Sequence, residues 1–340
     1  MSDPILSLFC GAGGLDIGFA EAGFDAKLAI DCDASAVESY NHNRVGNPGV
    51  VADLASLKPE GLLRKWESLS DTPPRGIVGG PPCQGFSVGN AYADPNDPRN
   101  LLPYRYSDIL DVFAESYGID FFVFENVPGL LGKKHSARFE RIKSRFRKAG
   151  FVLHQKEIDA VEFSVPQNRR RLFIVGIRDT HMCANGFNFP EPTSNEEMTV
   201  KSAIAGLPRV TYVSRSSVQP VNKHHPNHWT MKPRSRRFTD KDFNNGRSFR
   251  RLSWGKPSWT VAYGNREIHV HPSGRRRLSV YEAMLLQGFP DDYELLGSFS
   301  AQVDQVSNAV PPPVAVGIAQ SIRECIDSTP AGREKAPQQS

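Results

Sequence analysis

One cysteine of the chain stands in a setting that suits a nucleophile. Cys83 lies inside the stretch GGPPCQGFS at residues 79–87. Prolines and glycines on both sides favour a rigid, exposed turn, and a thiolate is a strong nucleophile once its pKa is lowered or a base is near. The alternative, a small buried apolar residue, is common for free cysteine but fits these rigid surroundings poorly. We therefore predict that Cys83 acts as a nucleophile.

A carboxyl group and a run of arginines could assist such a nucleophile. Glu125 opens the sequence ENVP directly after an apolar run, and a carboxyl group at a semi-buried strand end can have a raised pKa and donate a proton. A helix cap or a hydrogen-bonded structural acid would explain Glu125 equally well. Arg169, Arg170 and Arg171 precede another apolar run, and in an extended chain the first and third point to one face. They could hold a base, a phosphate or an acidic loop, or form a solvated charge run.

A glycine-rich turn near the N-terminus predicts a cofactor site. The sequence FCGAGG occupies residues 9–14, and Asp31 follows Gly14 by 17 residues, the usual place for a carboxylate that binds ribose hydroxyls. Asp16 stands where a dinucleotide fingerprint has its third glycine. This disfavours NAD and favours an adenosyl cofactor without a pyrophosphate. Taken alone, the turn could also have only a packing role.

The elements that must position these residues follow an alternating pattern. Short apolar runs alternate with helical patterns through residue 125, which predicts βαβ units and a parallel sheet. We expect strands at 5–9, 26–30, 50–52, 77–78 and 121–124, and helices at 15–22 and around 109–117. The glycine-rich turn, Asp31, Asp53, Cys83 and Glu125 all follow strand ends. Ligands of open α/β sheets bind beyond the carboxyl ends of the strands, so these residues should converge.

The charge of the chain is unevenly distributed. Residues 201–277 contain 17 Lys and Arg against three acids, a net charge of +14, whereas the rest of the chain has a net charge of −10. A solvated basic face is one interpretation, but a surplus this large over so short a segment favours contact with nucleic acid. The tryptophans in or near this segment, Trp229, Trp254 and Trp259, could touch nucleic acid or pack in a small core.

Composition argues against several other classes. The 340 residues are 39% hydrophobic, without the roughly 20-residue apolar run that spans a bilayer and without a signal peptide, so we expect a cytoplasmic protein. Five scattered cysteines without a CxxC pair support neither a disulfide framework nor a zinc site. The cluster His224-His225-Pro226-Asn227-His228 could suggest a metal, but Pro226 breaks helical ligand spacing, and we predict none. His269 and His271 are expected to be structural.

The later part of the chain predicts a different organisation. Residues 186–275 are rich in Pro, Asn, Arg and aromatics with weak periodicity, which indicates a separate, irregular or β-rich module. A last helix is expected at about 314–326, after three prolines. The tail from residue 328 is polar and expected to be disordered.

These stretches together resemble the bacterial DNA (cytosine-5) methyltransferases of restriction–modification systems. The resemblance covers nearly the whole chain in the same order, through LSLFCGAGGLDIGF, GGPPCQGFS, FENVPGLL, VPQNRRRLFIVG, RRLSVYEAMLLQGFPDDY and QVSNAVPPPVAVGIAQSI. It implies a Rossmann-like, S-adenosylmethionine-dependent methyltransferase fold with a second, smaller target-recognition domain.

The resemblance also implies the catalytic roles. Cys83 would add to C6 of a cytosine, Glu125 would hold or protonate N3, and Arg171, with Arg169, would contact the base or steady the catalytic loop. The target base would be flipped out of the duplex, as methyltransferases do. The loop 87–100 would close over the DNA.

The same resemblance implies the cofactor contacts. Asp31 would bind the ribose of S-adenosylmethionine and Asp53 the adenine amine. Cys32 stands where relatives often place an aromatic against the adenine, which puts stacking there in question. The full set of implied cofactor-binding residues is Phe9, Gly11, Gly13, Gly14, Leu15, Asp31, Cys32, Asp53, Leu54, Pro81 and Asn308.

The expected organisation is a catalytic cofactor-binding domain at 1–185, a target-recognition domain and hinge at 186–302, a segment at 303–327 returning to the first domain, and a disordered tail at 328–340. Expected partners are double-stranded DNA and a cognate restriction endonuclease acting on the same site. We expect a monomer without a membrane contact, bound to the nucleoid through DNA. The alternatives are a tRNA cytosine-5 methyltransferase of the same fold, an inactive nucleic-acid-binding protein and, least favoured, a nicotinamide-dependent dehydrogenase.

Overall fold

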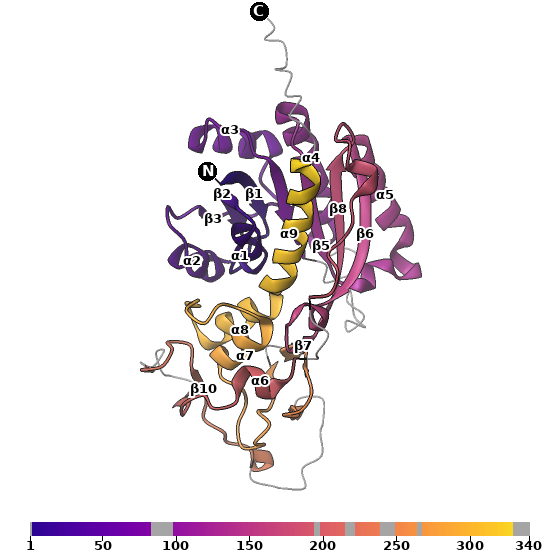
Figure 1. The fold of residues 1–340 in the computed structure, drawn as a ribbon. Helices are drawn as coiled ribbons and strands as arrows, with labels where there is room; N and C mark the ends of the chain where they lie inside the picture. Colours follow the sequence, from indigo (N-terminus) through magenta and orange to yellow (C-terminus); the bar gives the residue numbers. More distant parts are fainter. Residues whose placement is uncertain are drawn as a thin grey trace, which may run out of the picture.

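The chain folds into a larger lobe built on a central sheet and a smaller, mostly irregular lobe below it (Figure 1). The computed structural model describes residues 2–82, 98–193, 198–214, 222–238, 249–263 and 267–328. We call the part formed by the described residues up to 193 together with the last helix the sheet lobe, and the part between them the small lobe. Cys83, most of the loop 87–100 and the tail after residue 328 lie outside the described ranges.

Seven strands form the central sheet in the order β3-β2-β1-β4-β5-β8-β6. Neighbouring strands from β3 to β5 are parallel, as predicted, whereas β8 runs antiparallel to both β5 and β6. The insertion of β8 between β5 and β6 was not predicted. The strand bounds are β1 Asp3–Leu8, β2 Phe24–Asp31, β3 Gly49–Val51, β4 Gly76–Gly79, β5 Phe121–Asn126, β6 Phe151–Asp159 and β8 Arg170–Arg178.

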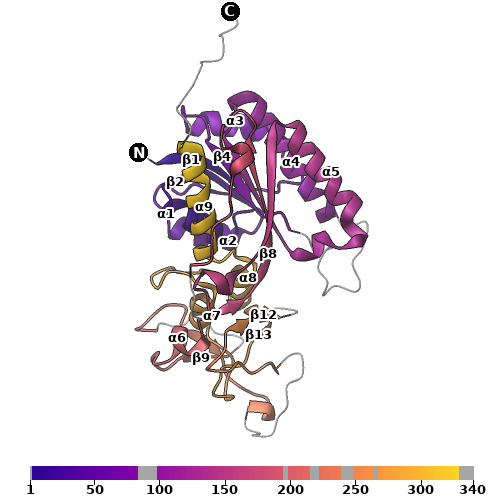
Figure 2. The ribbon, with the colours of Figure 1, turned by 45° about the vertical axis from the view of Figure 1, so that its right-hand side comes forward.

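Helices cover both faces of this sheet (Figure 2). On one face α1 packs along α9, and their apolar side chains meet those of β1, β5 and β8 in one core. On the other face α3, α4 and α5 cover a second core that is rich in phenylalanine. The helices of this lobe are α1 Gly14–Glu21, α2 Ala34–His42, α3 Pro59–Leu69, α4 Leu102–Tyr117, α5 Ser136–Lys148 and α9 Pro312–Asp327.

Local sequence explains where several of these helices begin and end. The side chain of Asp33 accepts backbone N–H bonds from Ser35 and Ala36 and so caps α2. Helix α4 ends at Gly118, whose φ of 62° suits a residue without a Cβ. The predicted helices at 15–22 and 109–117 and the last helix are confirmed, but α2, α3 and α5 were not predicted.

The helices and strands in the described parts of the small lobe are short. Its strands are β9 Thr211–Val213, β10 Trp229–Met231, β11 Ser258–Trp259, β12 Ala262–Tyr263 and β13 Glu267–Ile268, and its helices are α6 Val200–Ile204, α7 Val280–Gln287 and α8 Phe299–Asn308. The pair β11–β7 (β7 Gln167–Asn168) joins this lobe to the sheet lobe. Short 3₁₀ turns complete the chain at Pro98–Leu101, Pro128–Leu131, Lys133–His135, Ala160–Phe163, Ala184–Gly186 and Arg236–Phe238.

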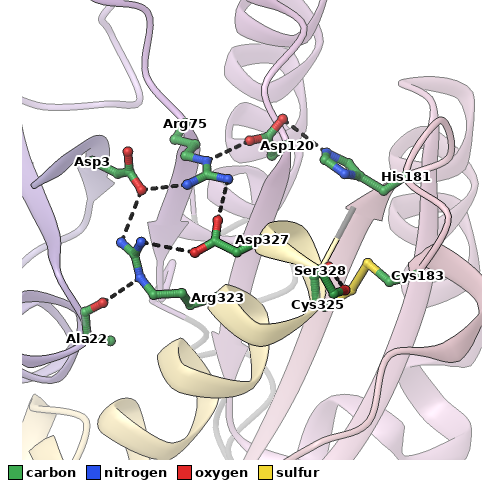
Figure 3. A network of polar contacts seen from close by, with 10 residues as sticks. All are labelled: Asp3, Ala22, Arg75, Asp120, His181, Cys183, Arg323, Cys325, Asp327 and Ser328. Carbon is green, nitrogen blue, oxygen red and sulfur yellow. Dashed lines mark hydrogen bonds and ion pairs between the residues drawn. A yellow bond between two sulfur atoms is a disulfide. The ribbon is translucent and has the colours of Figure 1, made fainter. Parts of the chain in front are cut away.

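The prediction that no disulfide framework exists is wrong for two of the five cysteines. Cys183 and Cys325 form a disulfide across 142 residues of chain, joining α9 to the segment after β8 (Figure 3). Nothing in the spacing of the cysteines reveals this pair, because only the packing of α9 against the sheet brings them together. Cys10, which is buried, and Cys32, which is exposed, are free thiols.

A polar network lies beside this disulfide and fixes the same helix (Figure 3). The guanidinium of Arg75 contacts Asp3, Asp120 and Asp327, with N–O distances of 2.5, 2.8 and 2.8 Å. Arg323 of α9 binds Asp3 at 3.1 Å as well. Burial opposes the charge of Arg75, but its hydrogen bonds to the three carboxylates outweigh this and raise its pKa. The C-terminal helix is therefore bound to the amino-terminal edge of the sheet by charge as well as by apolar packing.

Candidate active site

The carboxyl ends of the parallel strands bring the predicted functional residues to one edge of the sheet. Leu8, the last residue of β1, pairs with Ile30 on one side and with Gly79 on the other. Gly79 in turn pairs with Phe124, the residue before Glu125. The glycine-rich turn, Asp31, Gly80 and Glu125 therefore lie at or directly after the carboxyl ends of adjacent strands.

Asp31 organises the glycine-rich turn. Its two carboxylate oxygens accept hydrogen bonds from the backbone N–H groups of Gly11, at 2.8 Å, and Asp33, at 2.9 Å. Burial raises the pKa of Asp31, and these backbone bonds oppose the rise. A carboxylate offers about four lone-pair positions, so Asp31 retains capacity for a further donor such as a ribose hydroxyl.

The backbone of the turn suits close approach by a cofactor. Gly11 has a φ of +52°, and a Cβ built there would meet no heavy atom within 4 Å. Phe9 also adopts a positive φ, 55°, which is uncommon for a residue with a side chain and is frequent at functional sites. Asp53 is exposed after β3, where Ala52 donates its N–H to the backbone oxygen of Asp31 at 2.9 Å. These residues fit an adenosyl cofactor with a ribose at Asp31.

Other residues of the implied cofactor set have a packing role in this structure. A Cβ on Gly14 would lie 2.4 Å from the backbone oxygen of Val310, so Gly14 allows the turn to meet the start of α9. Leu15 is buried in the core beneath α9, and Leu54 is buried under the opposite face. Gly13 has a φ of +84° and caps α1.

The remaining members of the cofactor set surround the same turn. Cys32 is exposed between Asp31 and Asp33. Its thiol group is nevertheless partly buried, and this raises its pKa. Asn308 is exposed at the end of α8, two residues before Val310, which touches Gly14. Its assignment and those of the other cofactor residues stay predictions.

Glu125, one of the predicted catalytic residues, is in contact with Arg171 and Gly80. Arg171 Nε is 3.0 Å from Glu125 Oε1, and only 11% of the Glu125 side chain is exposed. A Cβ on Gly80 would lie 2.5 Å from Glu125 Oε2, so glycine there leaves room for the carboxyl group in this position. Burial raises the pKa of Glu125, although the charges of Arg171 and Arg169 oppose the rise. A raised pKa is the property expected of a proton donor.

Of the three consecutive arginines, Arg170 points away from the other two, as the alternation along an extended chain predicted. Arg169 is 1% exposed and Arg171 contacts Glu125, whereas the Arg170 side chain is 69% exposed. Burial lowers the pKa of Arg169, and the like charge of Arg171 adds to this effect. Arg169 Nη2 donates to the backbone oxygen of Ala309 at 2.8 Å, which links the arginine run to the residue after Asn308.

Two glutamines that the sequence reasoning missed hold this arrangement together. Gln287 Nε2 donates to the same Ala309 oxygen at 2.6 Å. Gln167 Nε2 donates to Gln287 Oε1 at 2.6 Å, and Gln167 Oε1 accepts the N–H of Val261 at 3.2 Å. Both glutamine side chains are fully buried. For Gln287 the signal in the sequence was an amide at the end of an apolar run, whereas Gln167 stands between Pro166 and the polar residues 168–171.

Asn126 was also missed as a site residue. Its Nδ2 donates to the backbone oxygen of Pro81 at 3.2 Å, and this bond ties the end of β5 to the segment that leads into Cys83. Pro81 is buried beside it. The predicted nucleophile, Cys83, lies outside the described ranges, and Pro82 is the last described residue before it.

Neither a metal site nor a membrane span is found in the part of the chain that the structure describes. No group of three or more His, Cys, Asp or Glu side chains there could hold a metal ion. The histidines of the 224–228 cluster bond within the lobe instead: His228 contacts Ser279 Oγ at 3.0 Å and the Pro208 oxygen at 2.9 Å. No helix among the described residues is long and apolar enough to cross a membrane.

The sheet order with one antiparallel strand, together with the glycine turn and its carboxylate, defines a Rossmann-like α/β fold with a candidate ligand site at the carboxyl ends of its strands. Residues 4–324 match the family model described as C-5 cytosine-specific DNA methylase, and the chain belongs to this family. S-adenosylmethionine is the cofactor of these enzymes and of this chain.

Individual relatives agree with this assignment. The chain is 32% identical to the Type II methyltransferase M1.HphI of Haemophilus parahaemolyticus, over 95% of this chain and 87% of the relative. It is 31% identical to M.MthTI of Methanothermobacter thermautotrophicus, over 96% and 99%. A prophage-encoded candidate DNA modification methyltransferase from E. coli superposes with a TM-score of 0.75 at 24% identity, covering 96% of this chain and all of that one, and shows the fold alone.

Proposed function

We propose that this chain methylates C5 of a flipped-out cytosine at a specific sequence of duplex DNA, with Cys83 as the nucleophile. The observation that carries the proposal is the buried pair of Glu125 and Arg171 against Gly80, three residues before Cys83. The raised pKa of Glu125 supports a role for its carboxyl group as a proton donor, and Gly80 beside it belongs to the segment that leads into Cys83. The predicted dehydrogenase alternative has no support in the family assignment.

The cofactor-binding role belongs to the turn around Asp31. When bound, S-adenosylmethionine supplies an electrophilic sulfonium methyl group. Asp31 would accept hydrogen bonds from the ribose hydroxyls, and the open backbone at Gly11 would lie against the cofactor. Asp53 would receive the adenine amine, and Asn308 would close the site from the side of α8. Pro81 would lie between the cofactor and the base.

The chain's own residues then act on the cytosine. The Cys83 thiolate would form a bond to C6 while Glu125 holds the proton at N3, so that electron density moves to C5. After C5 has taken the methyl group, loss of the C5 proton and cleavage of the sulfur–C6 bond would release Cys83 as a thiolate. Arg171 and Arg169 would hold the Glu125 carboxyl group in position relative to the base, because both guanidinium groups lie near that carboxylate.

The small lobe would bind the duplex and read its sequence. Nine of its described Lys and Arg side chains are exposed, namely Lys201, Arg209, Lys223, Lys232, Arg234, Arg236, Arg251, Lys256 and Arg275. Contacts to phosphates position a duplex without reading it, while an arginine on a guanine edge reads it in the major groove. We expect both kinds here. Arg247 and the loop 87–100, up to residue 97, lie outside the described ranges, and closure of that loop stays a prediction.

The remaining details belong to the same proposal. We propose a monomer that acts beside a cognate restriction endonuclease and is bound to the nucleoid through DNA. We retain the division into a catalytic domain at 1–185, a recognition domain and hinge at 186–302, and a returning segment at 303–327. The last boundary falls within α8, whose residue Gln305 bonds Ser39 of the sheet lobe at 2.7 Å.

Bisulfite sequencing of plasmid from cells that express the chain tests this proposal. We expect complete protection of one cytosine in one sequence context, and none in cells that express Cys83→Ser. Duplex DNA with 5-fluorocytosine at that position should trap a covalent adduct with the native chain, because fluorine cannot leave as a cation. Methylation of tRNA without methylation of DNA, or full activity of Cys83→Ser, would contradict the proposal.

A further inference from the structure

The three tryptophans of the small lobe have different surroundings. Trp229 is 2% exposed, and its Nε1 donates to Gln302 Oε1 at 2.9 Å, which gives it a core role. Trp254 is 37% exposed and packs edge-on against His271, with ring centroids 5.1 Å apart. Trp259 is the most exposed of the three, at 43%. The question left by the sequence, whether these rings pack or touch nucleic acid, therefore has a separate answer for each.

Trp259 is held at the junction of the two lobes. Strand β11 pairs with β7 so that Trp259 lies opposite Asn168, the residue before Arg169. The backbone on both sides of the ring is fixed, because Ser258 donates its N–H to the Pro166 oxygen at 2.8 Å and Val261 donates to Gln167 Oε1 at 3.2 Å. Trp259 is thus held by backbone pairing against β7, and the chain continues from β7 into Arg169 and Arg171.

The surroundings of the ring combine an aromatic face with a cation. The guanidinium carbon of Arg250 lies 4.9 Å from the centroid of the Trp259 ring. The ring of His269 approaches at 5.8 Å with its plane tilted by 66°. Arg250 is placed by its backbone, since its carbonyl accepts the N–H of Val270 at 2.9 Å. The segment that supplies both side chains has the net charge of +14, so a polyanion matches it in charge.

We propose that Trp259 and Arg250 together contact the DNA beside the target cytosine, with the indole ring against a base and the guanidinium against a phosphate. This inference rests on the proposed function. Taking a base out of the duplex costs stacking energy, and an aromatic ring on a neighbouring base offsets part of that cost. The register sets Trp259 opposite Asn168 of β7, the residue before Arg169, and Arg169 is one of the arginines proposed to contact the flipped base.

Substitution of the two exposed tryptophans tests the assignment. Trp259→Ala should weaken binding of the duplex that the enzyme methylates by about 5- to 150-fold, the effect typical of losing one stacked base. Trp259→Phe should retain most of the affinity. Trp254→Ala is the matched control, because Trp254 has similar exposure in the same lobe, and it should bind within about twofold of the native chain. Binding of S-adenosylmethionine, measured by calorimetry, should be unchanged in all three variants.

Intrinsic fluorescence keeps the test independent of the stability of Trp259→Ala. Duplex DNA should quench the emission of the native chain and of Trp254→Phe, and the quenching should be largely lost in Trp259→Phe. Native affinity in Trp259→Ala, equal losses in both alanine variants, or unchanged quenching in Trp259→Phe would overturn the inference. A native chain that methylates no duplex DNA would instead refute the proposed function.

Discussion

The two lobes are stabilised by different kinds of burial. The sheet lobe buries mainly apolar side chains, with a cluster of Tyr106, Phe122, Phe124 and Phe146 whose ring centroids lie 4.6 to 6.2 Å apart. The small lobe has an apolar core around α7 and α8, but it also buries His228, Asn227, Gln302 and Glu282 in specific hydrogen bonds.

This difference separates two requirements of the enzyme. The sheet fixes the relative positions of Asp31 and Glu125 through backbone pairing, which depends little on which apolar residues are present. The small lobe uses two- and three-residue strands joined by side-chain bonds, so its loops can vary as long as the buried polar groups keep their partners. Four changes sharpen or break this comparison, and they are ordered from the largest expected effect to the smallest.

Two buried carboxylates, one in each lobe, should behave oppositely when neutralised. Glu125 has a raised pKa and a proposed chemical role. Glu125→Gln should lower kcat by roughly 10²- to 10⁴-fold, the usual contribution of a positioned acid. Its loss of stability should be smaller than that of Glu282→Gln below, because burial already disfavours the charged form of Glu125. Single-turnover methyl transfer to duplex DNA measures the first effect and urea unfolding the second. Activity within tenfold of the native chain would remove Glu125 from the chemistry.

Glu282 is the matched carboxylate in the small lobe. Although burial opposes its charge, hydrogen bonds from Arg276, at 2.6 and 2.7 Å, lower the pKa of Glu282. Glu282→Gln leaves the Arg276 charge buried without its counterion and should cost about 3–5 kcal/mol of unfolding free energy. Urea unfolding measures this loss.

The exposed pair of Lys27 and Asp25 provides the control for that substitution, since Asp25→Asn should cost at most about 1 kcal/mol. The rate of methyl transfer per folded Glu282→Gln molecule, with DNA saturating, should stay near the native value. A large loss of kcat without a loss of stability would mean that Glu282 takes part in the chemistry after all.

The Cys183–Cys325 disulfide should stabilise the return of α9 to the sheet lobe. It closes a loop with a sequence separation of 142 residues that contains the entire small lobe. Its removal by Cys183→Ala should lower the unfolding free energy by about 2–4 kcal/mol, mainly because the unfolded chain gains freedom. Urea unfolding under oxidising conditions measures the change. Cys32→Ala is the control, since that thiol is free and exposed. Equal stability with and without reductant would argue against a structural role.

Mild acid should weaken the small lobe before the sheet lobe. Burial lowers the pKa of His269 and of His271 to about 4, so below pH 6.5 the unfolded chain binds more protons than the folded one. Each histidine should cost about 1.4 kcal/mol at pH 5.5, a loss that grows as the pH falls towards 4. The raised pKa values of Asp31 and Glu125 act in the opposite sense, because the folded sheet lobe then holds more protons than the unfolded chain.

Hydrogen exchange at pH 7.5 and 5.5, corrected for the intrinsic rates, measures this difference. Amide protection should fall in α7 and around β11 while it is kept in β1 and β5. His269→Gln should reduce the acid sensitivity of the small lobe. Equal loss of protection in both lobes would contradict the assignment of the effect to the buried histidines.

Motifs and apolar periodicity determined the parallel part of the sheet and the candidate site, because both are local in sequence. A strand followed by a polar residue identifies Asp31 and Glu125 wherever the strand lies, and alternation alone predicted that Arg170 points away from Arg169 and Arg171. The net charge of residues 201–277 likewise required only counting.

The tertiary structure decided what depends on contacts between distant residues. The pairing of β8 between β5 and β6, the disulfide of Cys183 with Cys325 and the Gln167–Gln287 hydrogen bond join segments that no local pattern relates. Trp259 gives the clearest case. The sequence around it allowed either a core or a surface role, and only the register of β11 with β7 set it, exposed, opposite Asn168, the residue before Arg169.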